Sequence, residues 1–445
     1  MMKFRLSLIG IILAGIALVS IGCDESTTSD TVWREPTLLD NFNGNAYRPQ
    51  IAADTYNNIM VVWIQDNESH TMSDIYCRKY SANSGWGSAA PVETHESSGY
   101  SYDVKLGSDW NMHFIAVWGR TEGSISRIYA NRFTPDNGWG NAEIIQESSS
   151  SQSAPDVAVE PVGNAIAKWL QYDNPYWTLY ATRYELASDE WYNPTPVESI
   201  SGNVESASFA FDHNYIGVFA WTQGDIYART HLGSTNSWND DVITIDDTAI
   251  SYDSPQVAMS PMNFTFIVWH VSSTVGNNIY YSKTDSGDDL WSDPATLDYT
   301  DKYSEQPQIA MDYYGNAVAM WMTQDNDTGT TSLYARRNSF SDGTWGGINF
   351  INTNSENGVV EYRLTMNGNG DMVVLWLEPS KLGYQDLYAG RIKAGSMTLE
   401  GRQLLDKGNG EIAYYNVAVD SDDNAIVVWQ KNDNGVLNIY SKWLN

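Results

Sequence analysis

Tryptophan recurs at a nearly constant interval through this chain, and that interval limits the possible folds more than any other feature. It closes a short apolar run at eight places, in steps of 48 to 55 residues: Trp63, Trp118, Trp169, Trp221, Trp269, Trp321, Trp376 and Trp429. Tyrosine keeps the same step in the run that follows each of them: Tyr76, Tyr129, Tyr180, Tyr227, Tyr280, Tyr334, Tyr388 and Tyr440. The runs have the length of strands, which excludes a solenoid of helices.

Each interval holds four apolar runs separated by Gly, Asn, Asp, Ser or Thr. In residues 306–346 the first three runs are Pro307 to Met311, Ala317 to Trp321 and Leu333 to Arg337, and a fourth opens at Trp345. Such a segment predicts a four-stranded antiparallel meander. A period near 50 residues with four strands is typical of propeller blades. The sequence therefore predicts an all-β fold, an eight-bladed β-propeller.

The fourth runs indicate how the ring would close. They carry Trp in six intervals and Leu in the seventh, while the sequence reaches Asn445 before an eighth: Trp86, Trp139, Trp191, Trp238, Trp291, Trp345 and Leu399. A matching run starts at Trp33 and ends at Asp40. We expect this run to supply the outer strand of the blade whose inner strands lie near 413–445, which would leave no unpaired edge at the seam.

The first residues have the pattern of an export signal. Lys3 and Arg5 precede an apolar stretch and small residues, so residues 1–22 are interpreted as a signal peptide, 23–32 as a polar tether and 33–445 as one propeller domain. The sequence Ser20-Ile21-Gly22-Cys23 resembles the bacterial lipoprotein box, with Ser20 where that family usually has Leu. The resemblance implies that Cys23 carries a lipid and anchors an exported protein to a membrane of the cell envelope, periplasmic or on the surface. Cys77 is the other cysteine, and no disulfide framework is expected.

Charge argues against nucleic acid as a partner. Without Lys3 and Arg5 the chain has 23 basic and 55 acidic residues, a net charge of −32. Such charge favours solubility, and we expect a monomer that meets the membrane only through its lipid. No zinc spacing, phosphate loop or serine elbow is present, so we expect no cofactor, no metal and no assignable catalytic residue. Asp325 to Gly329 resembles a calcium loop, but its glycine comes one place early, and we interpret it as a solvated loop.

Residues demanded by every repeat are interpreted as packing. We assign the repeated tryptophans to the core between blades, the alternative being a platform for glycans. A polar residue follows each fourth run, where the chain crosses to the next blade: Asp40, Glu93, Gln146, Glu198, Asp246, Asp298, Asn352 and Asp406. We expect these crossover residues to bond loop backbone, the alternative being a ring of negative potential.

A single ligand needs residues that the repeat lacks. Lys168 stands before Trp169 where other repeats have an apolar residue, and Lys105 is aligned with the inner alanine of the other first runs. Asp103 and Asp156 are aligned at one first-run position, which Arg363 also takes, and Trp177 lies outside the repeated slots. The candidate ligand-binding residues are therefore Asp103, Lys105, Asp156, Lys168, Trp177 and Arg363. The alternative is a self-neutralising Lys–Asp cluster with a packed indole.

Four motifs together carry a family resemblance: an Asp-x-x-Gly-Asn-Ala turn, an apolar run ending in Trp, an Ile/Leu-Tyr-Ala run and a Gly-Trp-Gly run. Over residues 33–445 the chain resembles the Trp-rich propeller repeats of exported bacterial proteins, many of them lipoproteins. It is similar at a distance to sialidase-like and lectin propellers, but the sialidase Asp-box is absent. Tyr47-Arg48-Pro49 is similar to the Arg-bearing motif at the start of the sialidase propeller, without a matched arginine triad.

Three functions follow as hypotheses. The first is a non-enzymatic propeller of the cell envelope that recognises a glycan or a protein through the variable loops between second and third runs. The second is a subunit of an envelope complex. The third is a glycan-directed enzyme, sialidase-like or using two carboxylates, which the abundance of Asp and Glu permits but does not locate.

Overall fold

The computed structural model describes residues 35–444 except 94–98, 213, 240, 249–250, 274–275, 286–289, 300–301, 352, 354–356, 382 and 421–422. Within these residues every regular element is a β-strand. The described part of the chain contains no helix with the length and apolar character needed to cross a bilayer. We number the repeat units one to eight in the chain order of their second-strand tryptophans, Trp63 to Trp429.

The strands fall into four positions within a unit. First strands are β2 (Ala46–Ala53), β7 (Tyr100–Ser108), β12 (Gln152–Val159), β17 (Ser206–Phe211), β22 (Ser251–Met259), β26 (Tyr303–Met311), β31 (Glu361–Met366) and β35 (Ile412–Val419). Second strands are β3 (Ile59–Asp66), β8 (Phe114–Glu122), β13 (Ala165–Asp173), β18 (Ile216–Gln223), β23 (Thr265–Ser273), β27 (Ala317–Gln324), β32 (Met372–Pro379) and β36 (Ala425–Asp433). Third strands are β4 (Ser73–Ser81), β9 (Ile125–Thr134), β14 (Tyr176–Glu185), β19 (Asp225–Leu232), β24 (Gly276–Thr284), β28 (Thr331–Ser339), β33 (Gln385–Ile392) and β37 (Val436–Leu444).

The fourth position is filled by shorter strands, several of them in two pieces. They are β5 (Gly85–Trp86) with β6 (Ala90–Pro91), β10 (Gly138–Trp139) with β11 (Glu143–Ser148), β15 (Glu190–Trp191) with β16 (Thr195–Pro196), β20 (Ser237–Trp238) with β21 (Ile243–Asp246), β25 (Ala295–Thr296), β29 (Thr344–Trp345) with β30 (Asn349–Ile351), β34 (Glu400–Asp406) and β1 (Thr37–Leu38). Both pieces of a pair lie against the third strand of the same unit.

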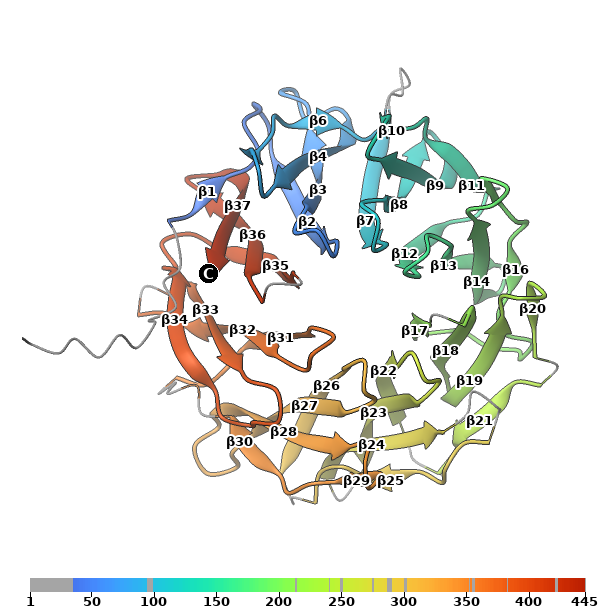
Figure 1. The fold of residues 1–445 in the computed structure, drawn as a ribbon, viewed down its shortest axis with the longest axis vertical. Coiled ribbons are helices and arrows are strands. Elements are labelled where there is room, and N and C mark those ends of the chain that lie inside the picture. The colour runs from blue at the N-terminus through green and yellow to red at the C-terminus, as the bar shows by residue number, and fades with distance from the viewer. Residues whose placement is uncertain are drawn as a thin grey trace, which may run out of the picture. The chain divides into compact units, whose positions relative to one another are not determined.

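Within each unit the strands pair in sequence order and antiparallel. A single parallel contact between Ser73 and Tyr100 joins the strands of units one and two into one sheet. The sheets stand around a common centre with their first strands innermost, which is the arrangement of a β-propeller (Figure 1). The prediction of an all-β propeller is confirmed at this level. β1 pairs with β37, Thr37 opposite Ser441 and Leu38 opposite Tyr440, so a strand from near residue 37 completes the sheet of unit eight.

Antiparallel pairing sorts the connections onto two faces. Turns from first to second strands lie on one face, which we call the turn face. Loops from second to third strands and the crossovers between units lie on the other, which we call the crossing face. The turns are held by their opening Asp: in unit six the Asp312 carboxylate accepts hydrogen bonds from the backbone N–H of Tyr314 at 2.9 Å and of Asn316 at 2.8 Å.

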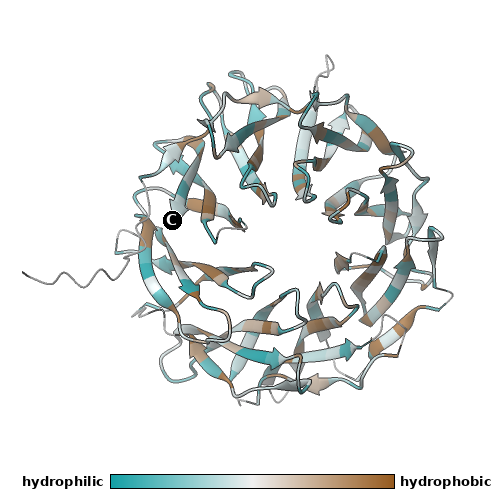
Figure 2. Ribbon diagram, in the orientation of Figure 1, coloured by the Kyte–Doolittle hydropathy of each residue, from teal (hydrophilic) through white to brown (hydrophobic). Residues whose placement is uncertain are grey.

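The core is built from the repeated aromatic residues. All eight second-strand tryptophans have 0 or 1% of their surface exposed, which confirms their assignment to packing. Each lies directly opposite the repeated tyrosine of the third strand, as Trp118 opposite Tyr129 with ring centroids 5.8 Å apart and 13° between planes. Hydrophobic residues follow the strands, and hydrophilic ones gather in the loops (Figure 2). Burying an indole on this scale contributes several kcal/mol, so each unit depends on its tryptophan.

Six first strands contain a bulge with one residue in the left-handed region, at φ of 47 to 54°: Arg48, Asp103, Ala154, Ser254, Gln306 and Tyr414. The register shifts there, and four of the six residues are followed by Pro, whose missing N–H a bulge tolerates.

The bulge corrects the alignment used in the sequence analysis. Lys105 pairs with Val117 and Asp156 with Lys168, so Lys105 and Asp156 share one position. Asp103 is the bulge residue instead of their equivalent. The place of the inner alanine in unit two belongs to Gly107, where a Cβ would lie 2.6 Å from a methyl carbon of Val159 in unit three.

Among the described residues, five of the eight units are also linked to the crossover before them. A long polar side chain on the third strand, two residues after the repeated tyrosine, donates to a backbone carbonyl of the preceding crossover: Arg78 to Leu38 and Leu39, Asn131 to Val92, Arg229 to Val197, Arg336 to Leu297 and Lys442 to Leu405. The three arginines and Asn131 also donate to a carbonyl just after the first piece of their own fourth strand. These links tie the outer strands to the previous unit.

Candidate functional site

Three of the predicted site residues meet between units two, three and four. Lys168 is 6% exposed, and its Nζ donates to the carbonyl oxygens of Ala154 and Ala207, both at 3.3 Å. Burial lowers the pKa of Lys168, the charge of Asp156 opposes that shift, and the charge of Lys105 adds to it. The ammonium group is therefore held by carbonyls from the first strands of two units. Its role in binding a ligand stays a prediction.

The other three predicted residues lie apart from that cluster. Asp103 forms an ion pair with Arg48 of unit one. Arg363 pairs with Glu361 at 3.0 Å and lies 5.9 Å from the ring centre of Tyr415.

Trp177 lies near the crossing-face end of β14. Its ring centroid is 5.6 Å from that of Tyr172. It stands four residues before Ala181, the partner of Lys168, which is roughly 13 Å along a strand. The structure thus does not gather the six residues into one site.

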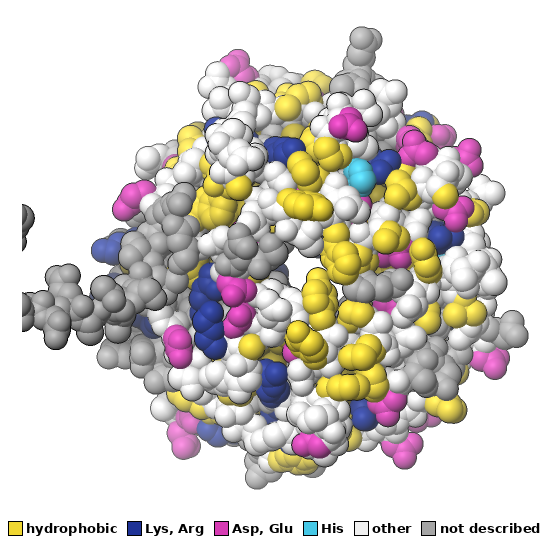
Figure 3. Space-filling view, in the orientation of Figure 1, with side chains coloured by type: hydrophobic (Ala, Val, Ile, Leu, Met, Phe, Trp, Pro, Cys, Tyr) yellow, Lys and Arg dark blue, Asp and Glu magenta, His cyan; other side chains and the backbone are white. Residues whose placement is uncertain are grey.

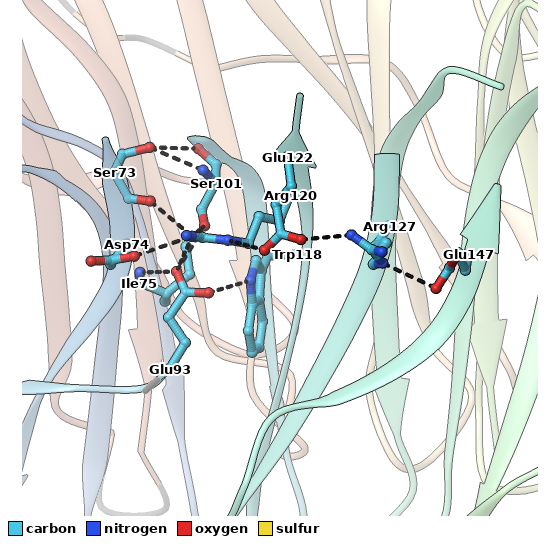
Figure 4. Close-up of polar contacts among 10 residues, drawn as sticks. All are labelled: Ser73, Asp74, Ile75, Glu93, Ser101, Trp118, Arg120, Glu122, Arg127 and Glu147. Carbon is cyan, nitrogen blue, oxygen red and sulfur yellow. Dashed lines mark hydrogen bonds and ion pairs between the residues drawn. The ribbon is translucent and has the colours of Figure 1, made fainter. Parts of the chain in front are cut away.

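A larger polar cluster lies where the chain enters unit two (Figure 4). The side chains of Glu93 and Arg120 are both 0% exposed, with Nη1 of Arg120 3.4 Å from Oε1 of Glu93. Glu93 also accepts from the Ser101 hydroxyl at 2.7 Å and the Trp118 indole at 3.1 Å. Burial raises the pKa of Glu93 to about 7, while Arg120 lowers it. Because both ions are enclosed and extensively bonded to the protein, this cluster belongs to the junction and offers no surface to a ligand.

The crossover residues bond loop backbone in part: Glu198 and Asp246 accept from the N–H groups of Ile200 and Thr248, both at 3.0 Å. Asp40 and Glu93 accept backbone N–H groups of the third strands, from Ile439 and Ile75, both at 2.7 Å. Others accept indole N–H groups, as Asp246 does from Trp269 and Asp406 from Trp429. Their carboxylates are spent inside the protein instead of forming a ring at its surface.

A cavity of about 440 Å³ opens at the centre of the turn face. It is lined by the first-to-second turns of units one, two, six, seven and eight: residues 53–55, 108–110, Met311, Tyr313, 366–369 and 419–420. Trp110 of unit two and Tyr313 of unit six meet here, with ring centroids 6.2 Å apart in an edge-on arrangement. They are 41% and 48% exposed, unlike the tryptophans of the core.

Neighbouring turns fix both rings. The backbone N–H of Trp110 donates to the Pro161 carbonyl at 3.2 Å, and its carbonyl accepts from the Thr55 hydroxyl at 2.8 Å. The backbone N–H of Tyr313 donates to the Gly368 carbonyl at 3.0 Å. Gly368 is required there, because a Cβ would lie 2.1 Å from the tyrosine ring. The two aromatic faces are thus presented by well-connected turns.

The polar lining of this cavity divides into two kinds. Asn367, Asn369, Thr55 and Ser108 supply amide and hydroxyl groups, and none of the lining residues is Lys or Arg. The carboxylates of Asp54, Asp109 and Asp420 bind their own turns through both oxygens. They accept from backbone N–H groups of Asn58, Asn111, His113 and Asn424 and contact the side chains of Asn58, His113 and Asn424. The Thr55 and Ser108 hydroxyls and the Asn367 amide also bond neighbouring turns, although the two hydroxyl oxygens can still accept. The site can therefore stack a ligand on its two rings beside polar groups that already have partners.

Further exposed apolar residues lie on the turns of neighbouring units: Tyr56, Val162, Met262 and Tyr314, at 45 to 63% exposure. Hydrophobic side chains gather around the central hollow of the face drawn in Figure 3. The mouth is therefore a contiguous surface of mixed aromatic and polar character.

Cys23 and Trp33 lie outside the described residues. Within the described part, Cys77 is buried and free, and no three His, Cys, Asp or Glu side chains gather as metal ligands would.

The sequence analysis selected Trp177 and passed over Trp110. Trp110, Trp177 and Trp443 are the tryptophans outside the repeated slots, so the signal for Trp110 was present. The sequence analysis does not select Trp110, because the variable loops favour a binding site on the crossing face.

No family model matches the chain, and no curated protein matches it. Among solved structures, a protein of unknown function from Dyadobacter fermentans is 12% identical, covering 94% of this chain and 99% of its own, with a TM-score of 0.46. An ulvan lyase of polysaccharide lyase family PL25 is 10% identical, covering 89% of this chain and 94% of its own, with a TM-score of 0.48. The β-propeller domain of the Trilobed protease from Pyrococcus furiosus is 12% identical, covering 82% of this chain and 97% of its own, with a TM-score of 0.45.

Proposed function

We propose that this protein is a glycan-binding propeller and that the cavity at the centre of the turn face holds a neutral sugar. The observation that carries the proposal is the pair of exposed rings, Trp110 and Tyr313, in an open cavity edged by amides and hydroxyls. Apolar faces of sugar rings stack on aromatic side chains, and sugar hydroxyls bond to amide and hydroxyl groups. The proposal moves the ligand from the variable loops of the crossing face to the opposite face.

The charge of the site selects among sugars. A lining with three aspartates and no Lys or Arg disfavours sialic and uronic acids, because an anion would meet like charge without a counter-ion. The same aspartates are bound to their turns, which supports binding over hydrolysis, since a glycosidase needs a free pair of carboxylates. We therefore place binding of a neutral glycan ahead of a sialidase-like activity.

A glycan array tests the proposal. The wild-type protein should bind one or more neutral oligosaccharides, and Trp110→Ala and Tyr313→Ala should weaken that binding at least tenfold with unchanged melting temperature. Trp177→Ala is the matched control, because it removes a partly exposed indole from the crossing face. Equal loss of binding in Trp110→Ala and Trp177→Ala, or no binding to any neutral glycan, would contradict the proposal.

We propose further that the fold is an eight-bladed ring closed by β1. Eight repeated tryptophans and the pairing of β1 with β37 support it. Removing residues 439–445 would then open the seam and expose strand edges of units one and eight, lowering the melting temperature of the whole domain in one transition. An unchanged melting temperature after this truncation would reject the closed ring.

We propose finally that the protein is an exported lipoprotein of the cell envelope, anchored through Cys23. The export pattern of residues 1–22 and the box before Cys23 support it. Cys23→Ser should move the protein from the membrane fraction to the soluble one. Mass spectrometry of the mature N-terminus is decisive, because an unmodified start at another residue would exclude lipidation.

A further inference from the structure

A basic residue of one unit lies under an aromatic ring of the next in the first part of the chain. Nζ of Lys79 in unit one is 4.9 Å from the ring centre of Phe133 in unit two. The guanidinium carbon of Arg132 in unit two is 5.8 Å from the ring centre of Tyr184 in unit three. Both pairs join third strands, and each cation is packed against the ring that the next unit supplies.

The series breaks between units three and four. Arg183 takes the place of Arg132, but His231 takes the place of Phe133 and Tyr184, four residues after the repeated tyrosine of its unit. Imidazole is smaller than the rings it replaces, and a cavity of about 70 Å³ remains, lined by Arg183 and His231 together with Tyr192, Asn193, Thr195 and Asn236 among others. The guanidinium carbon of Arg183 lies 5.9 Å from the ring centres of both Tyr192 and Tyr215.

Two buried groups at this cavity have unused bonding capacity. Arg183 and His231 are each 6% exposed, and within the described residues neither Nε of Arg183 nor Nδ1 of His231 has a hydrogen-bond partner. Nε of Arg132 and of Arg391 is unpaired too, so an unpaired Nε is a property of the repeat. Among the described third strands, only unit four has an imidazole at this position, and the cavity lies beside it.

The lining also has an unusual charge for this protein. The chain has 55 acidic and 25 basic residues, yet no Asp or Glu lines this cavity. Glu185 is 3.5 Å from Nη2 of Arg183 and lines a separate, larger cavity on the turn-face side of the junction. Glu160 also lies within electrostatic reach of Arg183. Burial lowers the pKa of His231 to about 4, against the opposing effect of a hydrogen bond with the Asn236 side chain, so its ring is neutral at pH 7 and Arg183 carries the charge.

We propose that this cavity binds a compact carboxylate of about the size of acetate, with the guanidinium of Arg183 and the imidazole of His231 as its principal partners. An arginine recognises a carboxylate through parallel N–H donors, and a neutral imidazole can donate one more. A water occupies about 10 to 15 Å³ on this measure of volume, so a cavity of about 70 Å³ has room for a few heavy atoms. The site lies on the outer strands, away from the cavity that holds the sugar.

Acetate itself is the probe. Increasing sodium acetate at pH 7, with sodium chloride making up constant ionic strength, should shift the imidazole NMR signals of His231 saturably and raise the melting temperature. The control variant is Arg132→Met, which alters the equivalent arginine of unit two, where Tyr184 fills the space, and it should respond as the wild type does.

Two variants separate binding from folding. Arg183→Met should lose the acetate response. His231→Phe installs the side chain that unit two has at this place and closes the cavity, so it should fold at least as stably as the wild type and show no response. A wild-type protein whose signals and melting temperature do not differ between acetate and chloride overturns the proposal, as does a response that survives in His231→Phe.

Discussion

The junctions into units two and three have the same geometry and opposite chemistry. Entering unit two, the crossover residue is Glu93, paired with buried Arg120 and bonded to the indole of Trp118. Entering unit three, the crossover residue is Gln146, which donates to Gln171 at 2.9 Å. The indole Nε1 of Trp169 has no partner there among the described residues. One junction is held by ions and the other by neutral amides.

The comparison shows that the repeat fixes the shape of this position and leaves its charge open. Trp118 and Trp169 are equally buried, so the core does not need the ion pair. Two buried ions lose hydration, and their mutual attraction offsets that loss only when both are present and well bonded. Glu93 and Arg120 therefore depend on each other more than the fold depends on them.

Removing one ion should have the largest effect. Arg120→Met leaves Glu93 buried without its cation and should lower the free energy of unfolding by about 3 to 5 kcal/mol, measured by urea denaturation at pH 8. Arg127→Met is the control, because Arg127 pairs with Glu122 and Glu147 nearer the surface and should cost about 1 kcal/mol or less. Equal losses of unfolding free energy in the two variants would mean that buried Glu93 depends on Arg120 no more than the surface carboxylates depend on Arg127.

Acidification should separate the junctions next. The pKa of Glu93 is about 7 in the folded protein and 4.5 as its ordinary value, so the folded state binds this proton more tightly than the unfolded state. The stability that the folded protein gains by binding this proton is absent above pH 7, grows as pH falls and is complete below about pH 4.5. The melting temperature of the wild type should therefore rise from pH 8 to pH 5 relative to that of Glu93→Gln/Arg120→Gln. Other buried groups, such as Asp40 and His231, titrate in both proteins, so parallel profiles would contradict the raised pKa.

Replacing the indoles should show a smaller difference. Trp118→Phe and Trp169→Phe remove similar buried volume, but only Trp118 loses a hydrogen bond and leaves Glu93 without that donor. Trp118→Phe should be more destabilising by about 1 to 2 kcal/mol in denaturant titrations. If Trp169→Phe costs as much or more, the indole bond contributes nothing measurable.

Converting one junction into the other should have the smallest effect. Glu93→Gln/Arg120→Gln copies the pair found at unit three and should change the free energy of unfolding by about 1 kcal/mol or less. Each single substitution should cost more than the double, which a double-mutant cycle measures as coupling. Additive losses would show that the two side chains act independently.

The fold was predictable because the same residues fill the same places in every unit. Trp63, Trp118 and their equivalents are buried opposite a repeated tyrosine, and a residue required eight times has one structural explanation. The pairing of β1 with β37 was predictable for the same reason, since the run that ends at Asp40 matches the other fourth runs.

Details of the candidate site were not predictable by the same route. Asp103 was aligned with Asp156 because a slip of two residues keeps every side chain on its face, so apolar alternation does not detect it. The distance to the tryptophan does: Lys105 and Asp156 each stand thirteen residues before theirs. In four units a Pro follows the bulge residue and marks the position of the bulge in the sequence. In unit two Val104 stands there, so the sequence does not mark the bulge.

The cavity on the turn face required the three-dimensional arrangement. Trp110 and Tyr313 are about 200 residues apart and belong to different units, and no period in the sequence states which turns meet at the centre. The depth of the site depends on how the units curve around the axis. That curvature comes from packing between sheets and has no local sequence signal.

The backward links of the third strands bear on how such a chain could grow. Each link joins a side chain of one unit, such as Arg229, to a carbonyl of the crossover before it, such as that of Val197. A duplicated unit would carry both the donor for its predecessor and the acceptor for its successor. Because the acceptor is backbone, the copy needs no matching substitution in its neighbour. Gene duplication could therefore add whole units without disturbing these contacts, and the number of units would be set by how many fit around the centre.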